Sequence, residues 1–540
     1  MTIGEKSTMQ KFEEFSLLKI IFSIFSIIIL RLFLENYVYP DAMGYFFSTE
    51  RVIHAILYFF SLYFSLSLLL YFFTKDVFEN ILIFVSKIFL FILAVPVVDF
   101  IFNTMTSKAF MAYLTVSPDK FLTTFLDILN PLSRQGVTFG QHFAAYAILI
   151  SMIIFVHKRS KDIIRILFLI ASVYLTLFFY EMIPSFIMLF GSPELLANQD
   201  ALSAYHSAIN QSWFSNYTEG FDSFNEVFFK TEIAHEITMA KIFFITLTLQ
   251  LGLIFFTAKR KFWNGIQKDL RITRIIYWFI IAAIGIVISQ KINGDIHLEN
   301  PINIISLLVF LIVGVLNAWL AAFVNDGEDI KIDTISNPDR PLITKAVSLT
   351  QWNVMQLVFL ILISFGMFTM NKSVISLFFV TQTIFYLYSS SPLRLKRHFA
   401  TSTILSGIAV VAIAMAGFFL VSPNQHVNAF PIKAILIIGI SYGLLSNFKD
   451  IKDFAGDSHE KIKTLPVVFG LQRSKYIIAA IWSIVLITVP LLLDTQGLML
   501  PLSVCVSLFL FYLFTKKEYQ EKYIFLAFFF YALALFLVTY

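Results

Sequence analysis

Long apolar runs separated by short polar segments fill this chain from end to end. A membrane-spanning helix needs about 20 mostly apolar residues, and most of the runs approach or exceed that length. In the first half we predict spans at roughly 16–36, 52–73, 79–103, 141–157, 163–189 and 241–257. In the second half we predict spans at roughly 275–290, 302–324, 354–370, 373–389, 401–421, 431–447, 475–493, 497–514 and 522–540. The pattern predicts an all-α, polytopic membrane protein with about six spans followed by about nine.

The composition supports this interpretation. Of the 540 residues, 58% are hydrophobic and 14% are charged, whereas a soluble domain is roughly 45–50% apolar and about 25% charged. We therefore expect an integral membrane protein that lies almost wholly in the lipid bilayer. The net charge of +5 does not indicate a nucleic-acid partner, because the basic residues are confined to short loops. The single cysteine, Cys505, excludes a disulfide within the chain.

The distribution of Lys and Arg among the loops orients the predicted spans. Cytoplasmic loops are enriched in basic residues, so the N-terminus, with Lys6 and Lys11, is predicted to be cytoplasmic. The loops that fall on the same side contain basic clusters at 158–161, 259–274, 394–397, 449–463 and 516–522. The segment 190–240 falls on the other side and is acidic. We expect a bacterial inner membrane or a plasma membrane as the location.

The basic stretch 258–274 divides the chain into two predicted regions. Residues 1–257 form a six-span membrane domain of unknown function, and residues 275–540 form a second domain with about nine spans. In the first region, Asp99 and Glu181 lie within predicted spans, where an ionisable residue is a functional candidate by default. Arg31 and Glu35 are four residues apart on one predicted helix and are expected to form a local ion pair.

Two stretches of the second region share one carboxylate spacing. Both NDGEDIKID and KDIKDFAGD contain Asp-x-x-Asp-x-x-x-Asp at the end of an apolar run, with carboxylates at Asp326, Asp329, Asp333, Asp450, Asp453 and Asp457. Steps of three and four residues return to one face of a helix. Each triplet therefore predicts a stripe of negative charge, and charge topology places both stripes on the cytoplasmic side. One acidic stripe is often only a solvated surface, but two of identical spacing on one side favour a site.

The residue types indicate the chemistry of such a site. Carboxylates without soft ligands favour Mg²⁺, which is often held by a few carboxylates together with substrate phosphates. Nearby cations would complete the neutralisation of a diphosphate, and the candidates are Arg340, Arg394, Lys396, Lys449 and Lys452. A diphosphate handled at a membrane surface suggests a prenyl diphosphate donor, whose tail would lie among apolar side chains. The acceptor would then also be hydrophobic.

These residues resemble those of a known family. The first stripe, continued by NPDRPL (337–342), is similar to the first aspartate motif of the UbiA superfamily of intramembrane prenyltransferases. The second stripe, followed by KIKTLPVVFG (461–470), is similar to the second motif of that family, and YSSSPLRLKR (388–397) resembles the segment between them. The resemblance covers residues of about 265–540 and implies a nine-helix UbiA-like bundle.

The resemblance also implies roles for individual residues. Asn325 and the six aspartates would bind Mg²⁺ and through it the diphosphate, with Asp326, Asp329, Asp450 and Asp453 as catalytic residues. Arg340, Lys396 and Arg394 would contact the diphosphate, and Tyr388 would lie near the donor, where its ring could stabilise an allylic cation. The reaction would be ionisation of the allylic diphosphate, followed by capture of the cation by a nucleophilic acceptor.

The chain departs from the family pattern on the side where the acceptor is expected. Gly327 and Glu328 replace the usual aromatic pair, and the second motif ends in Ala455-Gly456-Asp457-Ser458. The acceptor therefore stays open among glycerol lipids, chlorins and quinone rings. Transfer of a phosphoribosyl group to a polyprenyl phosphate, a transporter or lipid-binding protein, and a degenerate membrane scaffold are the alternatives.

Overall fold

The computed structural model describes residues 3–38, 48–102, 113–127, 130, 137–191, 201–213, 224–267, 271–460, 462–516 and 520–539. Every regular element in these ranges is a helix, and the one β-type pairing among them is an isolated bridge between His398 and Lys463. The prediction of an all-α protein is therefore confirmed.

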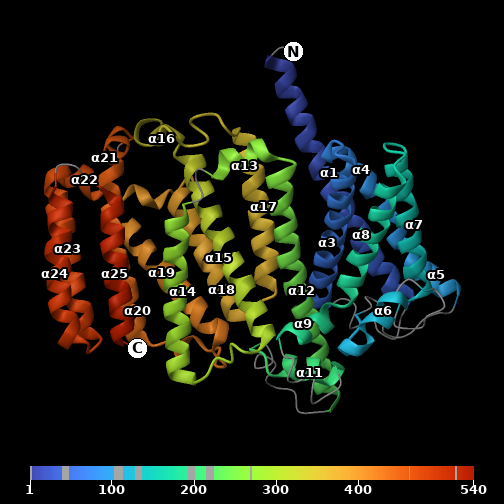
Figure 1. The fold of residues 1–540 in the computed structure, drawn as a ribbon. Helices are drawn as coiled ribbons and strands as arrows, with labels where there is room; N and C mark the ends of the chain where they lie inside the picture. Colours follow the sequence, from blue (N-terminus) through green and yellow to red (C-terminus); the bar gives the residue numbers. More distant parts are fainter. Residues whose placement is uncertain are drawn as a thin grey trace. The chain divides into compact units, whose positions relative to one another are not determined.

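The first part of the chain forms several long helices with shorter pieces between them (Figure 1). The long helices are α1 (Ile3–Val38), α3 (Thr49–Thr74), α7 (Phe139–His157), α8 (Ile163–Glu181) and α12 (Phe224–Thr257). The shorter elements are α4 (Phe78–Ile88), η2 (Phe89–Leu93), α5 (Ala94–Ile101), η3 (Pro118–Lys120), α6 (Phe121–Asp127), α9 (Ile183–Gly191) and α11 (Ala201–Asn210). The predicted span at 79–103 is thus divided into α4, a 3₁₀ turn and α5. Pro96, which cannot donate to a carbonyl one turn earlier, follows that turn.

The second part contains long helices, and most of its short elements lie at one end of them (Figure 1). The long helices are α14 (Ile272–Asn293), α15 (Pro301–Glu328), α17 (Leu349–Phe368), α18 (Lys372–Ser389), α19 (Phe399–Val421), α20 (Ile432–Leu445), α23 (Leu471–Leu492), α24 (Gln496–Thr515) and α25 (Glu521–Thr539). The short elements are α13 (Arg260–Ile266), α16 (Ile330–Ser336), η6 (Leu395–Arg397), η7 (Val427–Ala429), η8 (Ser446–Lys449), α21 (Asp450–His459) and α22 (Leu465–Phe469).

The described residues contain 14 segments long and apolar enough to cross a membrane. This agrees with an integral membrane protein but not with the full predicted count. The predicted span at 373–389 does form a helix, α18, yet it is not among the 14. Its run of Thr381, Gln382 and Thr383 makes this helix less apolar than its neighbours. The split into six and nine spans therefore stays a prediction.

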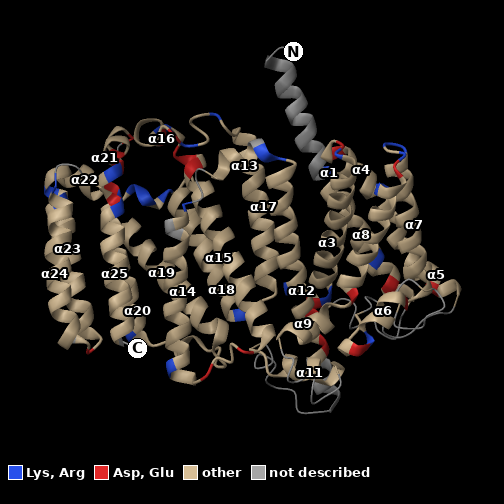
Figure 2. Ribbon diagram, viewed as in Figure 1, with Lys and Arg blue, Asp and Glu red and all other residues tan. Residues whose placement is uncertain are grey.

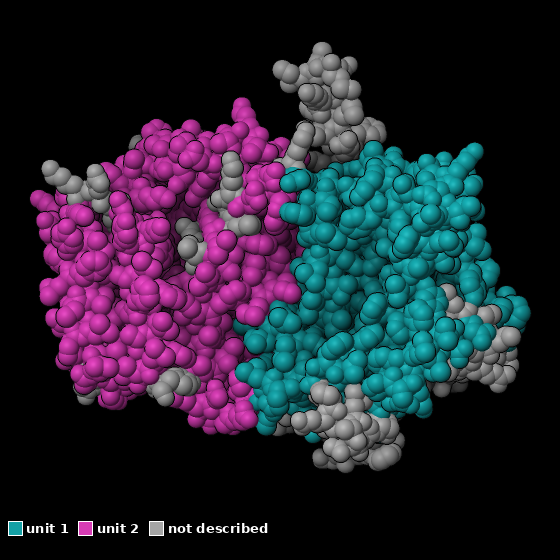
Figure 3. Space-filling view, in the orientation of Figure 1, with its two compact units in different colours: residues 1–260, 297–310 teal, residues 261–296, 311–540 magenta. Residues whose placement is uncertain are grey.

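The chain forms two compact units (Figure 3). Unit 1 comprises Met1–Arg260 and His297–Phe310, and unit 2 comprises Lys261–Ile296 and Leu311–Tyr540. The first ten residues of α15 thus group with unit 1, and the rest of that helix groups with unit 2. The functional division into residues 1–257, a connector and residues 275–540 stays a prediction.

Close packing of α14 on α19 depends on glycine inside unit 2. A Cβ atom added to Gly285 would lie 1.8 Å from the backbone oxygen of Ala414, and one added to Gly417 would lie 2.1 Å from the backbone oxygen of Ala282. Small residues let membrane helices approach until their backbones touch. Since both obstacles are backbone atoms, a side chain at either position would have to push the two helices apart.

We therefore predict that Gly285→Val lowers the stability of the protein. Overpacking of this kind costs about 1–3 kcal/mol, and the expected result is a lower midpoint of thermal unfolding for the purified protein in detergent. Gly252→Val is the matched control, because no atom lies within 4 Å of a Cβ placed there. Equal midpoints for the two variants would contradict this account of the α14–α19 contact.

Candidate active site at one end of unit 2

The first carboxylate stripe spans a break between two helices. Asp326 lies in the last turn of α15, Asp329 occupies the N-cap position of α16, and Asp333 lies inside α16. Asp329 has φ −95° and ψ 13°, which are not helical values. The prediction of one continuous helical stripe is therefore wrong at this motif. The turn at Asp329 nevertheless preserves the grouping, since Arg340 contacts the carboxylates of both Asp326 and Asp333.

The second stripe does lie on one helix. A 3₁₀ turn over Ser446–Lys449 leads directly into α21, which contains Asp450, Asp453 and Asp457. These three positions return to one helical face, as the spacing predicts. All three side chains line a cavity that Asp329 and Asp333 of the first stripe also line. The structure therefore brings the two stripes to one place, at an end of unit 2 where charged residues gather around α16 and α21 (Figure 2).

A glycine permits this approach. Gly456 packs against α16, and a Cβ atom added to it would lie 2.6 Å from Ser336 Oγ and 2.7 Å from Ile332 Cγ2. A larger residue would have to displace one of these side chains or move α21. The glycine in the second motif therefore has a packing role that places two acidic helices side by side.

Basic side chains neutralise the first stripe. Arg340 Nη1 donates to Asp326 Oδ1 over 2.6 Å and also to the carboxylate of Asp333. Arg271 donates to Asp326 as well. Arg394 and Lys396 both donate to the carboxylate of Asp329. Each aspartate of the first stripe is thus held by at least one cation.

The aspartates of the first stripe and the cations that pair with them form a charged layer, and Asn325 links this layer to α18. Its Oδ1 atom accepts from Lys396 Nζ over 2.7 Å and from Ser389 Oγ over 3.2 Å. Ser389 ends α18, so the amide fixes the position of α15 relative to α18 and to the basic loop that follows it. Tyr388, the preceding residue, has its hydroxyl 3.2 Å from Ser402 Oγ.

Burial shifts the pKa values of two site residues, Asp333 and Lys396, that lie outside the membrane spans. The pKa of Asp333 is raised to about 6, chiefly by burial, although Arg340 opposes the change. Burial likewise lowers the pKa of Lys396, while the neighbouring Asp329 opposes that change. Both effects have one cause, because removal from water penalises the charged form of either group. The site is therefore a poorly solvated place in which charges depend on one another.

The cavity joins the charged layer to an apolar interior. Its volume is about 310 Å³. Its polar lining includes Arg271, Asn325, Asp329, Asp333, Arg340, Tyr388, Lys396, Lys449, Asp450, Asp453 and Asp457. Its apolar lining includes Trp278, Ile281, Ala409, Ile413, Leu445, Trp482 and Phe528. One end can thus hold an anionic group through cations or a metal, and the other can hold a hydrocarbon.

Most of the predicted site residues meet here, and two lie just behind the cavity wall. Asp326 is only 3% exposed and Arg394 is 8% exposed. Neither lines the cavity, but each forms an ion pair with a residue that does. Lys452 is a different case, because its side chain is 53% exposed and lies 4.0 Å from Glu521. Two residues beyond Asp450, it is about 200° round the helix from that carboxylate. The prediction that Lys452 binds substrate is therefore not supported by its placement.

Sequence reasoning missed Arg271. This residue precedes α14, lines the cavity and pairs with Asp326. Arg271 lies in the basic stretch 258–274, whose many charges indicate membrane topology and do not single out one residue as a ligand. Only the fold shows that the start of α14 lies beside the end of α15, 55 residues further along the chain.

Unit 1 contains buried polar residues of its own. The carboxylate of Asp99 accepts from Thr138 Oγ1 over 2.6 Å and from the backbone nitrogen of Gly140 over 2.7 Å. These two hydrogen bonds fix the first turn of α7, so the role of Asp99 is structural. The predicted ion pair between Arg31 and Glu35 is confirmed at 2.7 Å. A functional role for Glu181 stays a prediction.

Sequence reasoning also missed a polar network between α3 and α12. His54, which is 1% exposed, contacts Glu236 through Nδ1 and lies 2.7 Å from the hydroxyl of Tyr113 through Nε2. Tyr205 and His235 form a further contact of 3.0 Å between the hydroxyl and Nδ1. His54 lies in an apolar stretch, and no local pattern indicates its partner 182 residues away.

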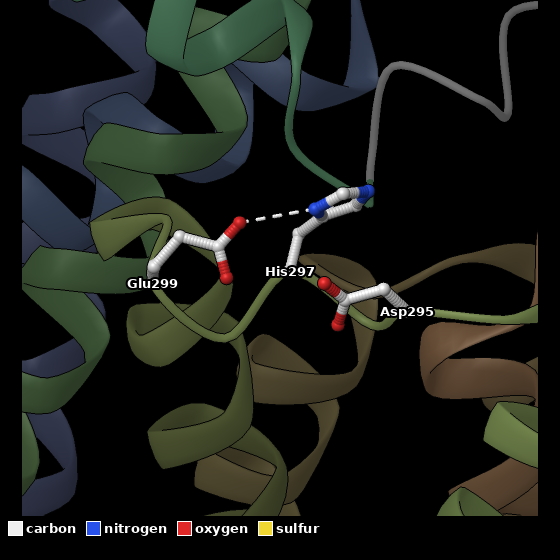
Figure 4. Close-up of side chains that lie close together, drawn as sticks. All are labelled: Asp295, His297 and Glu299. Carbon is white, nitrogen blue, oxygen red and sulfur yellow. Dashed lines mark hydrogen bonds and ion pairs between the residues drawn. The ribbon is translucent and has the colours of Figure 1, made fainter.

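An exposed group lies in the loop between α14 and α15 (Figure 4). Side-chain oxygen or nitrogen atoms of Asp295, His297 and Glu299 lie within 4.8 Å of one another, and His297 Nδ1 is 3.0 Å from Glu299 Oε1. Exposed acidic groups of this kind are common, and this loop contributes no residue to the cavity.

An apolar helical bundle with paired carboxylate stripes at one end of its cavity defines a class: an intramembrane enzyme for a substrate with a charged head and a hydrocarbon tail. Residues 277–534 match the model of the UbiA prenyltransferase family. This match confirms, for that region, the resemblance seen in the motifs.

Curated relatives of the chain have related names. A digeranylgeranylglyceryl phosphate synthase of Methanococcus maripaludis (strain C5) is 28% identical over 243 residues, which cover 44% of this chain and 82% of the relative. The chloroplastic chlorophyll synthase of Arabidopsis thaliana is 24% identical over 228 residues, which cover 40% of this chain and 56% of that protein. Among solved structures, a UbiA homologue from Archaeoglobus fulgidus bound to GPP and Mg²⁺ is similar, with a TM-score of 0.41 and 17% identity. That match covers 52% of this chain and 98% of the other.

We predict that Arg271→Gln weakens the binding of Mg²⁺-diphosphate by at least about tenfold, because a charge-assisted contact is worth about 1.5–3 kcal/mol. The measurement is calorimetric titration of the purified full-length protein with Mg²⁺-diphosphate. Lys452→Gln is the matched control, since it also removes one cation near the motifs but at an exposed position outside the cavity. If both variants lost affinity equally, general charge rather than the cavity contact would be responsible.

Proposed function

We propose that unit 2 transfers a prenyl group from a prenyl diphosphate to a hydrophobic acceptor, and that the transfer depends on Mg²⁺. The observation that carries this proposal is the meeting of both carboxylate stripes at the polar end of a cavity whose other end is apolar. The match of residues 277–534 to the UbiA prenyltransferase family supports it. The names of the relatives, which include digeranylgeranylglyceryl phosphate synthases and a chlorophyll synthase, support a lipid-like acceptor.

The residues present suit Mg²⁺. The donors are carboxylate oxygens, which hard cations prefer over other ligands. No ion pair between described residues involves Asp450, Asp453 or Asp457, while every aspartate of the first stripe has a cation beside it. A bound cation would therefore offset charge that these three carboxylates leave without an ion pair. When bound, Mg²⁺ would offset the negative charge that develops on the leaving diphosphate.

The cations of the chain would hold and orient the diphosphate. Lys396, Arg340 and Arg271 line the cavity and already contact carboxylates of the first stripe. A metal ion at those carboxylates would let the same cations turn toward phosphate oxygens. Lys449, directly before the second stripe, is a further candidate. Binding through several fixed cations places the bond to be broken at the border between the charged and the apolar lining.

The apolar part of the cavity would protect the reaction from water. Ionisation of the donor breaks the bond between the allylic carbon and the diphosphate oxygen, and the diphosphate keeps the electron pair. Water would capture the resulting cation, so a lining of Trp278, Ile413 and Trp482 favours transfer over hydrolysis. Tyr388 lines the cavity, and its ring would stabilise positive charge there. The predicted cytoplasmic position of the site rests on loop charge alone.

We expect Asp326→Asn and Asp450→Asn each to lower Mg²⁺-dependent prenyl transfer by at least about 100-fold, the scale seen when one preorganised electrostatic group is removed. The measurement is incorporation of label from geranylgeranyl diphosphate into membrane lipids. Asn keeps the shape of the side chain and removes only the charge. Asp494→Asn is the control, because that carboxylate is 81% exposed in its side chain and lies away from the cavity lining. Undiminished transfer in either site variant would overturn the proposal.

A further inference from the structure

The cavity at the carboxylate stripes has an apolar end that closes at the contact between α14 and α19. Ile281 and Ile413 are the last residues of these two helices that line the cavity. The residues that directly follow them, Ala282 and Ala414, lie against glycines of the opposite helix. Because the two backbones touch there, no passage is left between the helices. The two isoleucines therefore form the floor of the cavity.

A row of aromatic rings lies at the same end of the cavity. Tyr277 of α14 lies 5.4 Å from Tyr442 of α20 and 6.1 Å from Phe528 of α25, measured between ring centroids. Phe528 in turn lies 5.4 Å from Trp482 of α23. All four side chains line the cavity, and rings at these distances pack against one another. A hydrocarbon tail that passed between these helices would have to displace a ring.

The wall formed by α15 consists of small residues and ends at a tryptophan. Ala318 and Ala322 line the cavity, so there is space for a hydrocarbon along this helix. One turn further from the charged end, the ring of Trp278 covers Gly314, and a Cβ atom placed on that glycine would lie 3.0 Å from Cζ3 of the ring. Trp278 also stacks on Phe378 of α18, with 6.0 Å between the ring centroids. The ring is thus held on two sides, and it ends the space along α15.

The distance from the charged end to the floor follows from the geometry of α19. Ser402 marks the charged end, because its hydroxyl lies 3.2 Å from that of Tyr388, the residue before the serine that bonds to Asn325. From Ser402 to Ile413 the helix rises by about 16 Å. An isoprene unit extends a chain by about 5 Å at ordinary carbon bond lengths. The space therefore holds about three units of a straight tail, and a fourth only where the tail bends.

We propose that this closed end selects the prenyl donor by length, so that unit 2 accepts diphosphates up to geranylgeranyl and rejects longer polyprenyl diphosphates. The inference rests on the proposed function and adds the length class of its donor. Ile413 and Phe528 are the residues that determine this specificity, one at the floor and one in the row of rings. A longer tail would have to separate α14 from α19 or displace a ring, and either change overpacks a closed apolar site.

The test measures the binding of donors that differ only in length. Labelled geranylgeranyl thiodiphosphate, which does not react, is bound to the purified full-length protein with Mg²⁺. It is then displaced by unlabelled geranylgeranyl, geranylfarnesyl or octaprenyl thiodiphosphate. We expect the two longer compounds to bind at least about tenfold more weakly than the geranylgeranyl compound, which is the scale of overpacking in a closed apolar site.

Two variants separate the floor from the row of rings. Ile413→Ala deepens the floor but leaves the helix contact in place, so it should improve the relative affinity for the geranylfarnesyl compound at least about threefold and leave the octaprenyl compound rejected. Phe528→Ala opens the row of rings, so it should improve the relative affinity for both long compounds. Ile408→Ala and Phe529→Ala are the matched controls, because these residues of the same helices are 48% and 39% exposed and lie outside the cavity.

Two results would overturn the inference. One is equal affinity of the unsubstituted protein for the octaprenyl and geranylgeranyl compounds, and the other is unchanged length selection in both variants relative to their controls. Transfer of label from geranylgeranyl diphosphate into membrane lipids is measured separately in the unsubstituted protein. Transfer that persists in either case leaves the proposed function standing, whereas a protein that neither binds nor transfers any donor removes both.

Discussion

Mutual repulsion among six aspartates is the constraint on which the structure of unit 2 depends. Packing of α21 against α16, made possible by Gly456, forces the two stripes together in a poorly solvated place. Like charges this close cannot all stay ionised without compensation. Arg271, Arg340, Arg394 and Lys396 compensate one stripe. No ion pair between described residues involves the other stripe, and this asymmetry supports the proposal that a metal-bound diphosphate occupies the site.

Unit 2 has two cavities with different linings, and the second, of about 510 Å³, lies among α15, α17 and α18. The charged layer gives way directly to tryptophan, isoleucine and phenylalanine side chains, so one molecule with an anionic head and an apolar tail can satisfy both. The neighbouring cavity offers only neutral hydrogen-bonding groups. Gly327 and Glu328 end α15, and a Cβ atom added to Gly327 would lie near Trp352 and Gln356 of α17.

Much of this could be predicted from the sequence, because membrane helices and helical charge stripes are local patterns. Apolar runs predicted the helices, and the repeated aspartate spacing predicted the site. The break at Asp329 could not be predicted, since it depends on where one helix ends, whereas the outward direction of Lys452 follows from its place two residues after Asp450 on one helix. The place of Arg271 and the contact of His54 with Glu236 depend on segments far apart in the chain. The polar residues of α18 were visible as a less apolar run, but only packing against α15 and α17 gives them a shared cavity.

The central claim is that both stripes hold one metal–diphosphate group. Electron paramagnetic resonance of Mn²⁺, used in place of Mg²⁺ on the full-length protein with a non-reactive prenyl thiodiphosphate, tests this most directly. We expect a pair of Mn²⁺ ions close enough for their spins to couple, and we expect the coupling to vanish when either stripe loses one carboxylate. Isolated Mn²⁺ signals, or coupling that survives the loss of a carboxylate from one stripe, would contradict the account.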